Sequence, residues 1–529
     1  MRRRIMKRKK VLTILISLIA FVFLTLLSGA GSTQAATAKE PEPKGKLVYA
    51  PSNATFSYRK AIDPHTGIGA EQTTINTLLF DSLIAKDPRG REIPAMAESW
   101  TIGPNWAYYD FKLRKGIKFH NGDPFTSKDA KFSIERAKRE DLLFVWGAEL
   151  RRHIDRVETM GDYQLRVYLK APYPAFPDRL YNNLMIVPKD YIEKVGEAGF
   201  AAKPVGAGPF QIVDFKHDEY VRVKAVRNHY RKTPFIDEVL YKTAEEPATR
   251  LAMLKTGEAD MIMLNAQHIP DVRKDPNLRI IWSQHTFLTT MVFQDLAHPN
   301  EPNPFLDERV RRAASLAIDR VGICKNVLND QSEPWGTFLA PYHAGFDPKR
   351  KADPYNPEQA RKLLAEAGYP NGFKTTFSTG SGSKIPFDVL TAQLNEVGIK
   401  AEFVVLEHGV WQKKHTLGEL RGLSYGSGPW WAGRVHPAVA LESHTMGSWA
   451  PVGRTMPEVV EAWKKLNNAE GKDIPKMAKE YDDLLFKKGF RVPLWSVHVA
   501  YAVNKRVESY DPVSGLIFPI RFEYIKLKN

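Results

Sequence analysis

The chain has 529 residues, 43% of them hydrophobic and 26% charged, so it is neither a disordered polymer nor a protein that crosses a membrane many times. At about 150 residues per domain, this length predicts roughly three domains with cores that need no covalent cross-links. The single cysteine, Cys324, excludes an internal disulfide framework and a zinc site built from cysteines. The formal charge is +16, but seven positive charges lie in the first ten residues and leave +9, so no nucleic-acid partner is expected.

The first 38 residues have the pattern of a secretory signal peptide. Basic residues precede an uncharged, mostly apolar run from Val11 to Leu27, and small residues follow up to Ala38. We expect cleavage after Ala35 or Ala38 and a periplasmic location. A lipid anchor would need a cysteine after the apolar run, where this chain has Ala30. A retained membrane anchor is the alternative, because the apolar run is only slightly shorter than the roughly 20 residues that span a bilayer.

Strands are expected first in the exported part of the chain. Residues 45–50 form the first of them. Residues 106–120 alternate in the two-residue period of a strand, and Asn121-Gly122 supplies a turn. A helix should follow Thr126, which is a good N-cap with Asp129 three residues further on.

Further helices are predicted in the second half of the chain. They cover 306–328, 357–367 and two stretches within 457–488, and the helix over 357–367 has Asn356 as its cap and Gly368 at its end. Strands and helices alternate without a fixed period. The pattern therefore favours a mixed α/β architecture over a solenoid.

Six motifs in a fixed order resemble those of a known family. They are PAMAESW (94–100), FKLRKGIKFHNGDPFT (111–126), VGAGPF (205–210), TRLAMLKTGEAD (249–260), VRRA with AIDR (310–320) and LLAEAGYP (363–370). This set is similar to the signature of the bacterial extracellular solute-binding proteins of family 5, the peptide/nickel type. Six ordered motifs over roughly 46–529 make a chance match improbable.

The resemblance implies a two-lobed flytrap fold of the dipeptide/oligopeptide-binding type, in which a solute is enclosed between the lobes. An extra domain is inserted in the first lobe. The implied division is 45–83 plus 205–292 plus 497–529 for lobe I, 84–204 for the inserted domain and 293–496 for lobe II. Such a protein captures a small organic solute or peptide and delivers it to an inner-membrane permease and ATPase of an ABC importer. We expect a monomer.

Two glycine-containing motifs need separate interpretation. Gly206-Ala207-Gly208 is followed at once by Pro209 and by a strand-like alternation, so we expect a turn and not a phosphate loop. Residues 422–426 match the nucleophile elbow of α/β-hydrolases around Ser424, and acids (Asp473, Asp482) and then His498 follow in the right order. An elbow needs a helix directly after the serine, which Gly428 and Pro429 would break. We expect no enzymatic activity and keep a secreted serine hydrolase as an alternative.

The loop from Gly428 to Pro437 carries the main prediction about the ligand. In peptide-binding members of the family this loop resembles W-x-x-D followed by an acid before proline, and the first acid holds the α-ammonium group of the peptide. Here Trp431 is kept, Arg434 or Gly433 stands at the place of the acid, and His436 replaces the acid before proline. An arginine suits a carboxylate or phosphate, so an anionic ligand is favoured over a free peptide. The alternative is that Arg434 points into solvent or pairs with Glu442.

Aromatic and polar residues elsewhere complete the predicted ligand site. Besides Arg434, Trp431, Trp430 and His436, the resemblance indicates Phe56, Tyr58, His65, Trp146, Phe293, Gln294 and Trp495. For each one alone, core packing explains the residue equally well; as a group they imply a ligand with a flat or apolar body. The spacing of the fourteen histidines shows no helical metal motif, so we expect neither a metal site nor a cofactor. A receptor that presents its ligand to a sensor protein is the remaining alternative.

Overall fold

The fold is that of a computed structural model, which describes residues 41–51, 62–66, 70–87, 91–142, 144, 146–173, 176–181, 184–381, 385–429, 436–445, 451–469, 471–512 and 520–528. The expected signal peptide lies outside these residues. No helix within them combines the length and apolar character that crossing a membrane requires.

A mixed sheet of eleven strands runs through the described part of the chain. Its order is β15-β14-β16-β12-β17-β11-β1-β10-β9-β8, and β13 pairs with β17 beside this path. The strands are β1 (Lys46–Ala50), β8 (Phe210–Lys216), β9 (Tyr220–Ala225), β10 (Glu238–Lys242), β11 (Met261–Leu264), β12 (Leu278–Phe293), β13 (Ser332–Pro334), β14 (Phe373–Gly380), β15 (Ile399–Leu406), β16 (Leu423–Pro429) and β17 (Arg491–Asn504).

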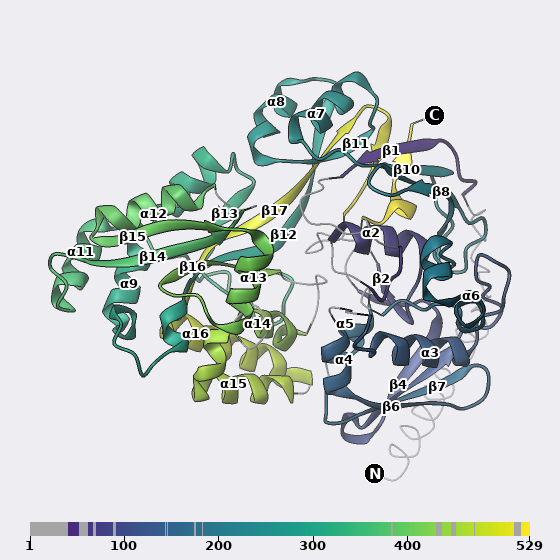
Figure 1. Ribbon diagram of the computed structural model, residues 1–529, viewed down its shortest axis with the longest axis horizontal. Coiled ribbons are helices and arrows are strands. Elements are labelled where there is room, and N and C mark those ends of the chain that lie inside the picture. The colour runs from purple at the N-terminus through teal and green to yellow at the C-terminus, as the bar shows by residue number, and fades with distance from the viewer. Residues whose placement is uncertain are drawn as a thin grey trace, which may run out of the picture. The chain divides into compact units, whose positions relative to one another are not determined.

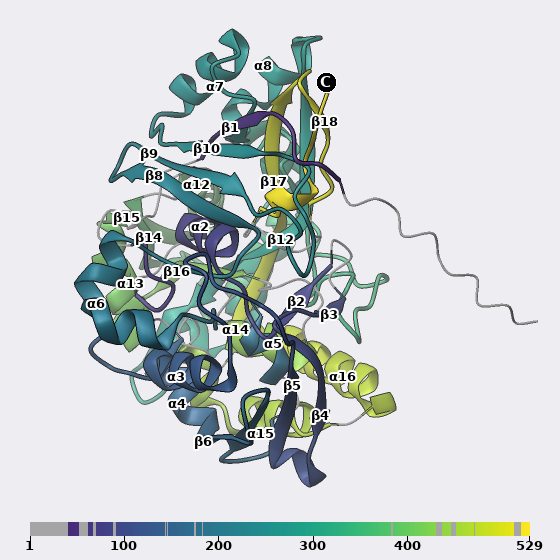
Figure 2. The same cartoon turned by 90° about the vertical axis from the view of Figure 1, so that its right-hand side faces the viewer.

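Strands β12 and β17 join the two halves of this sheet. They pair antiparallel along almost their whole length, with β16 beside the end of β12 and β11 beside the end of β17. Figures 1 and 2 show the two long strands running side by side between the β14–β16 group and the β1–β11 group. The sequence of β17 is nearly continuously apolar, as expected for a central strand that is covered on both faces.

A second sheet forms within the segment expected to be the inserted domain. Its order is β4 (Ala97–Ile102), β5 (Tyr108–Leu113), β7 (Gln164–Leu169) and β6 (Ile154–Thr159). The predicted strand alternation is confirmed over β5, which buries Tyr109, Phe111 and Leu113. The strand is shorter than the predicted 106–120, because a turn begins after Leu113. Two hairpin-like pairs, β2 (Ile84–Lys86) with β3 (Glu92–Pro94) and β18 (Val507–Ser509) with β19 (Lys526–Leu527), complete the described strands.

Helices cover both sheets. Within the described residues they are α2 (Ala70–Leu79), α3 (Ser127–Ala137), α4 (Gly147–His153), α5 (Phe176–Leu180), α6 (Lys189–Ala202), α7 (Pro247–Thr256), α8 (Ile269–Lys274), α9 (Glu308–Leu316), α10 (Arg320–Gly322), α11 (Pro357–Glu366), α12 (Phe387–Glu396), α13 (His408–Leu417), α14 (Pro437–Thr445), α15 (Pro457–Asn467) and α16 (Ile474–Lys488). In Figure 1, α9, α11, α12 and α13 surround β14–β16, and α3 and α4 lie beside the smaller sheet.

Most of the predicted helix starts are confirmed. Thr126 and Asp129 form the expected capping box at α3, and the Asn356 side chain accepts the Gln359 amide at the start of α11. Helices α15 and α16 are the two expected within 457–488. At α3 and α11 the capping side chain satisfies backbone amides that the first helical turn leaves without partners.

The prediction of one helix over 306–328 is wrong. Helix α9 ends at Leu316, and α10 begins at Arg320 and passes into a π-helical turn, Ile323–Val327. The carboxylate of Asp319 accepts the Gly322 amide at 2.8 Å and so starts a new helix inside the predicted one. The buried Arg320 guanidinium donates to the Ser315 carbonyl at 3.0 Å, which stabilises the end of the first helix.

Gly206 and Gly208 lie in an irregular segment that bends at 208–209, and the structure shows why both are glycines. A Cβ on Gly206 would lie 2.0 Å from the Leu79 carbonyl oxygen, and one on Gly208 would lie 2.5 Å from the Leu78 carbonyl oxygen. The two glycines therefore let the chain pass directly against the end of α2. A strand, β8, follows them, so the context of a phosphate loop is missing.

Replacing Gly206 with alanine should destabilise the protein by about 3 kcal/mol, because the methyl group meets rigid backbone and forces α2 and this segment apart. Gly116→Ala is the control, since its Cβ would meet nothing within 4 Å and carries only the strain of a φ of +80°. That strain costs roughly 1 to 2 kcal/mol. Urea denaturation compares the two variants, and equal losses would show that the close approach at Gly206 is unimportant.

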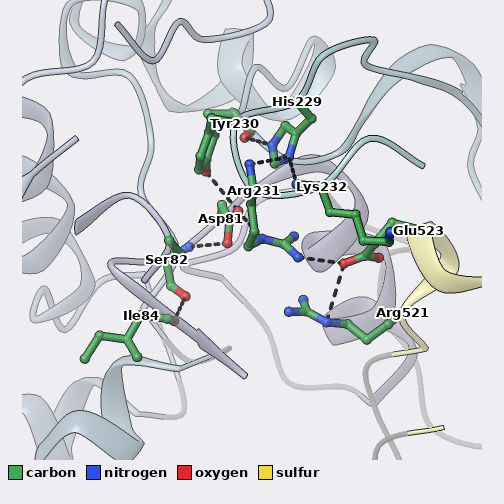
Figure 3. Close-up of polar contacts among 12 residues, drawn as sticks. Asp81, Ser82, Ile84, His229, Tyr230, Arg231, Lys232, Arg521 and Glu523 are labelled. Carbon is green, nitrogen blue, oxygen red and sulfur yellow. Dashed lines mark hydrogen bonds and ion pairs between the residues drawn. The ribbon is translucent and has the colours of Figure 1, made fainter. Parts of the chain in front are cut away.

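A buried network of charges connects three distant parts of the chain (Figure 3). Asp81 accepts hydrogen bonds from the Tyr230 hydroxyl at 2.8 Å and from Arg231 Nε at 2.9 Å. Arg231 Nη1 donates to Glu523 at 2.8 Å, and Arg521 Nε lies 3.6 Å from the same carboxylate oxygen. The side chains of Asp81, Arg231 and Glu523 are at most 4% exposed. The network ties the region before β2 and the β9–β10 connection to the C-terminal segment.

Candidate functional site

The loop predicted to contact ligand lies between two well-defined elements. Strand β16 pairs with both β12 and β14, and α14 begins at Pro437. Trp430, Trp431 and Arg434 fall between these two elements and lie outside the described residues. Phe56 and Tyr58, in the N-terminal part of the chain, also lie outside the described residues. Their ligand contacts stay predictions.

His436 is placed at the start of α14. Its Nδ1 accepts the Ala438 amide at 3.3 Å, and the residue is half-buried. The imidazole therefore caps the first turn of α14, a role that an aspartate before proline fills equally well. The capping contact alone is a sufficient reason for a polar residue at position 436. Contact between His436 and a ligand stays a prediction.

Arg491, which sequence reasoning missed, joins α14 to β12, the strand that pairs with β16 before the loop. Its Nε donates to the Thr290 hydroxyl on β12 at 2.8 Å, and its Nη1 donates to the His444 carbonyl on α14 at 2.9 Å. A Cβ on Gly426 of β16 would lie 2.4 Å from its Nη2, so Gly426 makes room for the guanidinium. Burial lowers the pKa of Arg491 to about 9. A single arginine at the start of β17, between Phe490 and the apolar residues that follow, was the available signal.

The predicted residues Phe293, Gln294 and Trp495 are all buried. Phe293 packs on Phe305 with ring centroids 5.1 Å apart, and Trp495 stacks on Phe387 at 5.9 Å. Gln294 is fully buried, and its Nε2 lies 2.6 Å from the Ser424 hydroxyl and 2.9 Å from His415 Nδ1. In this structure the three side chains fill the core around β12 and β17, and no observation tests their contact with a ligand.

The serine at the predicted elbow lies within a strand. Ser424 belongs to β16, which continues to Pro429, so no helix follows it and the strand-to-helix turn of a nucleophile elbow is missing. Its hydroxyl is buried beside Gln294. Asp482 accepts hydrogen bonds from Thr337 and the Phe338 amide, while His498 Nδ1 accepts the His285 amide. Ser424, Asp482 and His498 thus each bond to other partners, and they do not form a triad.

The candidate residues His65 and Trp146 lie on separate segments that are close to each other. The His65 ring lies 5.7 Å from the Phe144 ring, and Trp146 immediately precedes α4. His65 Nε2 bonds to the Met185 carbonyl at 2.8 Å, and burial lowers the pKa of this histidine to about 4. The structure therefore brings His65 close to the segment that carries Trp146.

An ion pair connects this segment to the helix after the predicted ligand loop. Arg152 Nη1 on α4 lies 3.9 Å from Glu442 Oε1 on α14. Glu442 is almost buried, whereas Arg152 is 64% exposed, so the pair itself contributes little stability. Its value is positional, because α4 belongs to the expected inserted domain and α14 to the expected lobe II. The pair thus brings α4, which follows Trp146, close to α14, which follows His436.

The sequence is similar to those of known solute-binding proteins. The profile of the bacterial extracellular solute-binding proteins, family 5, matches residues 92–439. Heme-binding protein A of Haemophilus influenzae is 25% identical over 458 residues, covering 81% of this chain and 82% of the relative. The glutathione-binding protein GsiB of Pectobacterium atrosepticum is 28% identical over 393 residues, covering 72% and 73%.

Solved structures show the same fold. The periplasmic binding protein DppA of Helicobacter pylori, in complex with the peptide STSA, aligns with a TM-score of 0.78 at 24% identity, over 92% of this chain and 98% of that chain. AgaA of A. tumefaciens R10, in complex with agropinic acid, aligns with a TM-score of 0.76 at 24% identity, over 92% and 99%. The predicted two-lobed fold is confirmed.

The fold and the matched segment define a solute-binding protein of an ABC importer, which binds a peptide or small solute and catalyses no reaction. Proteins of this class work outside the cytoplasmic membrane with a permease and an ATPase. The chain belongs to the bacterial extracellular solute-binding proteins of family 5.

Proposed function

We propose that this protein captures an anionic small organic solute in preference to a free peptide. The observation that carries the proposal is that Arg434 or Gly433 stands where peptide-binding members of the family have the acid for the α-ammonium group, so the acid is missing and an arginine lies at or beside its place. A guanidinium pairs with a carboxylate or phosphate through two parallel hydrogen bonds, whereas it repels an ammonium group.

The surroundings of the loop support an anion. Arg491 places a second guanidinium between β12, β16 and α14, directly beside the elements that hold the loop. Among the similar structures, AgaA and MoaA of A. tumefaciens R10 are complexes with agropinic acid and mannopinic acid. An acidic ligand with a flat or apolar body also suits Trp430 and Trp431, because indole rings offer broad apolar contact.

The export route and the domain division belong to the same proposal. The signal peptide of residues 1–38 would be removed on export, and no lipid would be attached. Lobe I would consist of 45–83, 205–292 and 497–529, with the inserted domain at 84–204 and lobe II at 293–496. Strand β12 has β16 as a second partner from Phe287 onward and β17 has β11 from Ala500 onward, which supports chain crossings along these two strands.

A thermal-shift screen of the mature protein against a metabolite library tests the anion preference. A true ligand at a hundred times its dissociation constant should add about 2.7 kcal/mol of stability. Each carboxylic acid that binds should be compared with its uncharged amide, which keeps the shape and removes the charge. We expect the acids to stabilise the protein and their amides to fail. Hits confined to dipeptides and tripeptides would contradict the proposal and leave a peptide-binding protein.

A further inference from the structure

The pairing of β12 with β17 is interrupted at one place. Ser283 pairs with Val499 and Phe287 pairs with Val497, so three residues of β12 face the single residue His498 of β17. On one side of this bulge β17 also pairs with β11, and on the other side it pairs with β13. The bulge therefore lies where the two halves of the large sheet are joined, and such bulges bend and twist the strands that carry them.

Side chains hold the backbone of the bulge. His285 has a φ of +52°, a conformation that costs free energy for any residue except glycine. Its amide donates to His498 Nδ1 at 3.0 Å, and its carbonyl accepts the Tyr342 hydroxyl at 2.6 Å. The backbone N–H and C=O of His285 thus bond to neighbouring side chains and not to a paired strand.

The hydrogen bond from the His285 amide assigns the tautomer of His498. A nitrogen that accepts an amide proton carries no proton, so neutral His498 has its proton on Nε2. Nε2 lies 3.6 Å from Glu333 Oε1, while His285 Nδ1 lies 3.3 Å from the same oxygen and 3.0 Å from the Ser496 hydroxyl. The ligand atoms of His285, Glu333 and His498 lie within 4.8 Å of one another, a spacing that fits a metal ion. His498 has no lone pair left to offer, however, so the group does not make a three-ligand site.

We propose that His498 is a proton-operated latch on the strand crossing: neutral His498 holds the bulge of β12, and protonated His498 releases it. Protonation adds an N–H at Nδ1, which then faces the N–H of His285 at hydrogen-bond distance. Two donors repel each other, so the contact that holds the strained His285 is lost. Because the crossing strands join the lobes of the proposed flytrap, release would change lobe closure; this last step rests on the proposed function.

The pKa values agree in direction with the geometry. Burial lowers the pKa of His498 to about 4, and burial together with the charge of His498 lowers the pKa of His285 to about 4. A lowered pKa means that the latched form is fully favoured above the ordinary histidine pKa of about 6.5 and loses stability as the pH falls towards 4.

Other titratable groups face the cluster. Burial raises the pKa of Glu333 on β13 and of Tyr342, and burial and then the charge of Glu333 raise the pKa of the Cys324 thiol to about 12. The Glu333 carboxylate favours the protonated forms of the nearby histidines, and so it opposes the lowering of their pKa by burial. A Glu333→Gln variant removes this opposing effect and should leave the pH response in place.

Hydrogen exchange of the peptide that contains the His285 amide tests the latch without any ligand. If one histidine changes its pKa from about 4 to about 6.5 on release, the protection of this amide, corrected for intrinsic exchange, should fall by up to about 25-fold between pH 7.5 and pH 5. His498→Asn places an amide oxygen near the position of Nδ1, accepts the same proton and does not titrate, so the fall in protection should be much smaller and should reflect His285 alone. His217→Asn, on an exposed turn, should respond as the wild type does. Unchanged protection in the wild type would overturn the proposal.

Nitrogen chemical shifts of ¹⁵N-histidine at pH 7.5 test the tautomer directly. We expect the proton of His498 on Nε2, and a proton on Nδ1 would overturn the assignment. Titration with Zn²⁺ or Ni²⁺ should show no binding that His498→Asn abolishes; such binding would make the cluster a metal site. A pH-dependent exchange rate in a protein that binds no solute would uphold the latch and refute the proposed function, so the two failures are distinct.

Discussion

Replacing Arg434 with alanine should weaken the binding of an anionic solute at least tenfold. In an enclosed site the substitution removes a charge-assisted hydrogen bond and leaves the charge of the ligand buried without a partner. The cost of this change is on the order of 2 to 5 kcal/mol of affinity. Calorimetry with the best acid from the screen measures the loss, and the melting temperature of the empty protein should stay constant.

The control for this substitution is an arginine on an exposed helix. Arg361→Ala, on α11, removes the same charge from the surface and should leave the affinity unchanged. Arg434→Asp returns an acid near the position at which peptide-binding members of the family have one, and it should abolish binding of the anion. Unaltered affinity in Arg434→Ala would mean that the arginine faces solvent, and the proposed anion preference would then lack support.

The second large effect is expected in the buried network of Figure 3. Arg231→Met leaves the carboxylates of Asp81 and Glu523 buried without their shared cation. Breaking a buried ion pair in this way costs about 3 to 5 kcal/mol of stability. Urea denaturation measures the loss. The exposed pair of Lys464 and Glu461 supplies the control, since Lys464→Met should cost less than about 1 kcal/mol. Similar losses in both variants would show that burial of the network does not matter.

The same network makes the stability of the fold depend on pH. Burial alone would raise the pKa of Asp81 and of Glu523, but the neighbouring Arg231 and Arg521 reverse this effect and lower both values. A lowered carboxyl pKa contributes stability above the ordinary value of about 4, and this contribution is lost as the pH falls below it. Glu523→Gln should therefore be less stable than the wild type at pH 7, and the difference should shrink towards pH 3.

Several features of this protein are encoded locally and were predictable from the sequence. The capping box at Thr126, the cap at Asn356 and the alternation in β5 each depend on residues a few positions apart, so a single sequence displays them. The order of the family motifs likewise indicated the two-lobed fold. Gly428 and Pro429 excluded a helix after Ser424, and β16 indeed continues through that region.

Other features depend on which distant segments meet, and only the tertiary structure decided them. Arg231 bonds to residues 150 and 292 positions away, and His498 bonds to an amide 213 positions away. No local period records such partners, because packing of whole elements selects them. The break at Asp319 shows the same limit, since the apolar spacing of 306–328 suits one helix. The helix is divided in two by the capping carboxylate of Asp319 and the buried guanidinium of Arg320, whose contacts exist only in the folded protein.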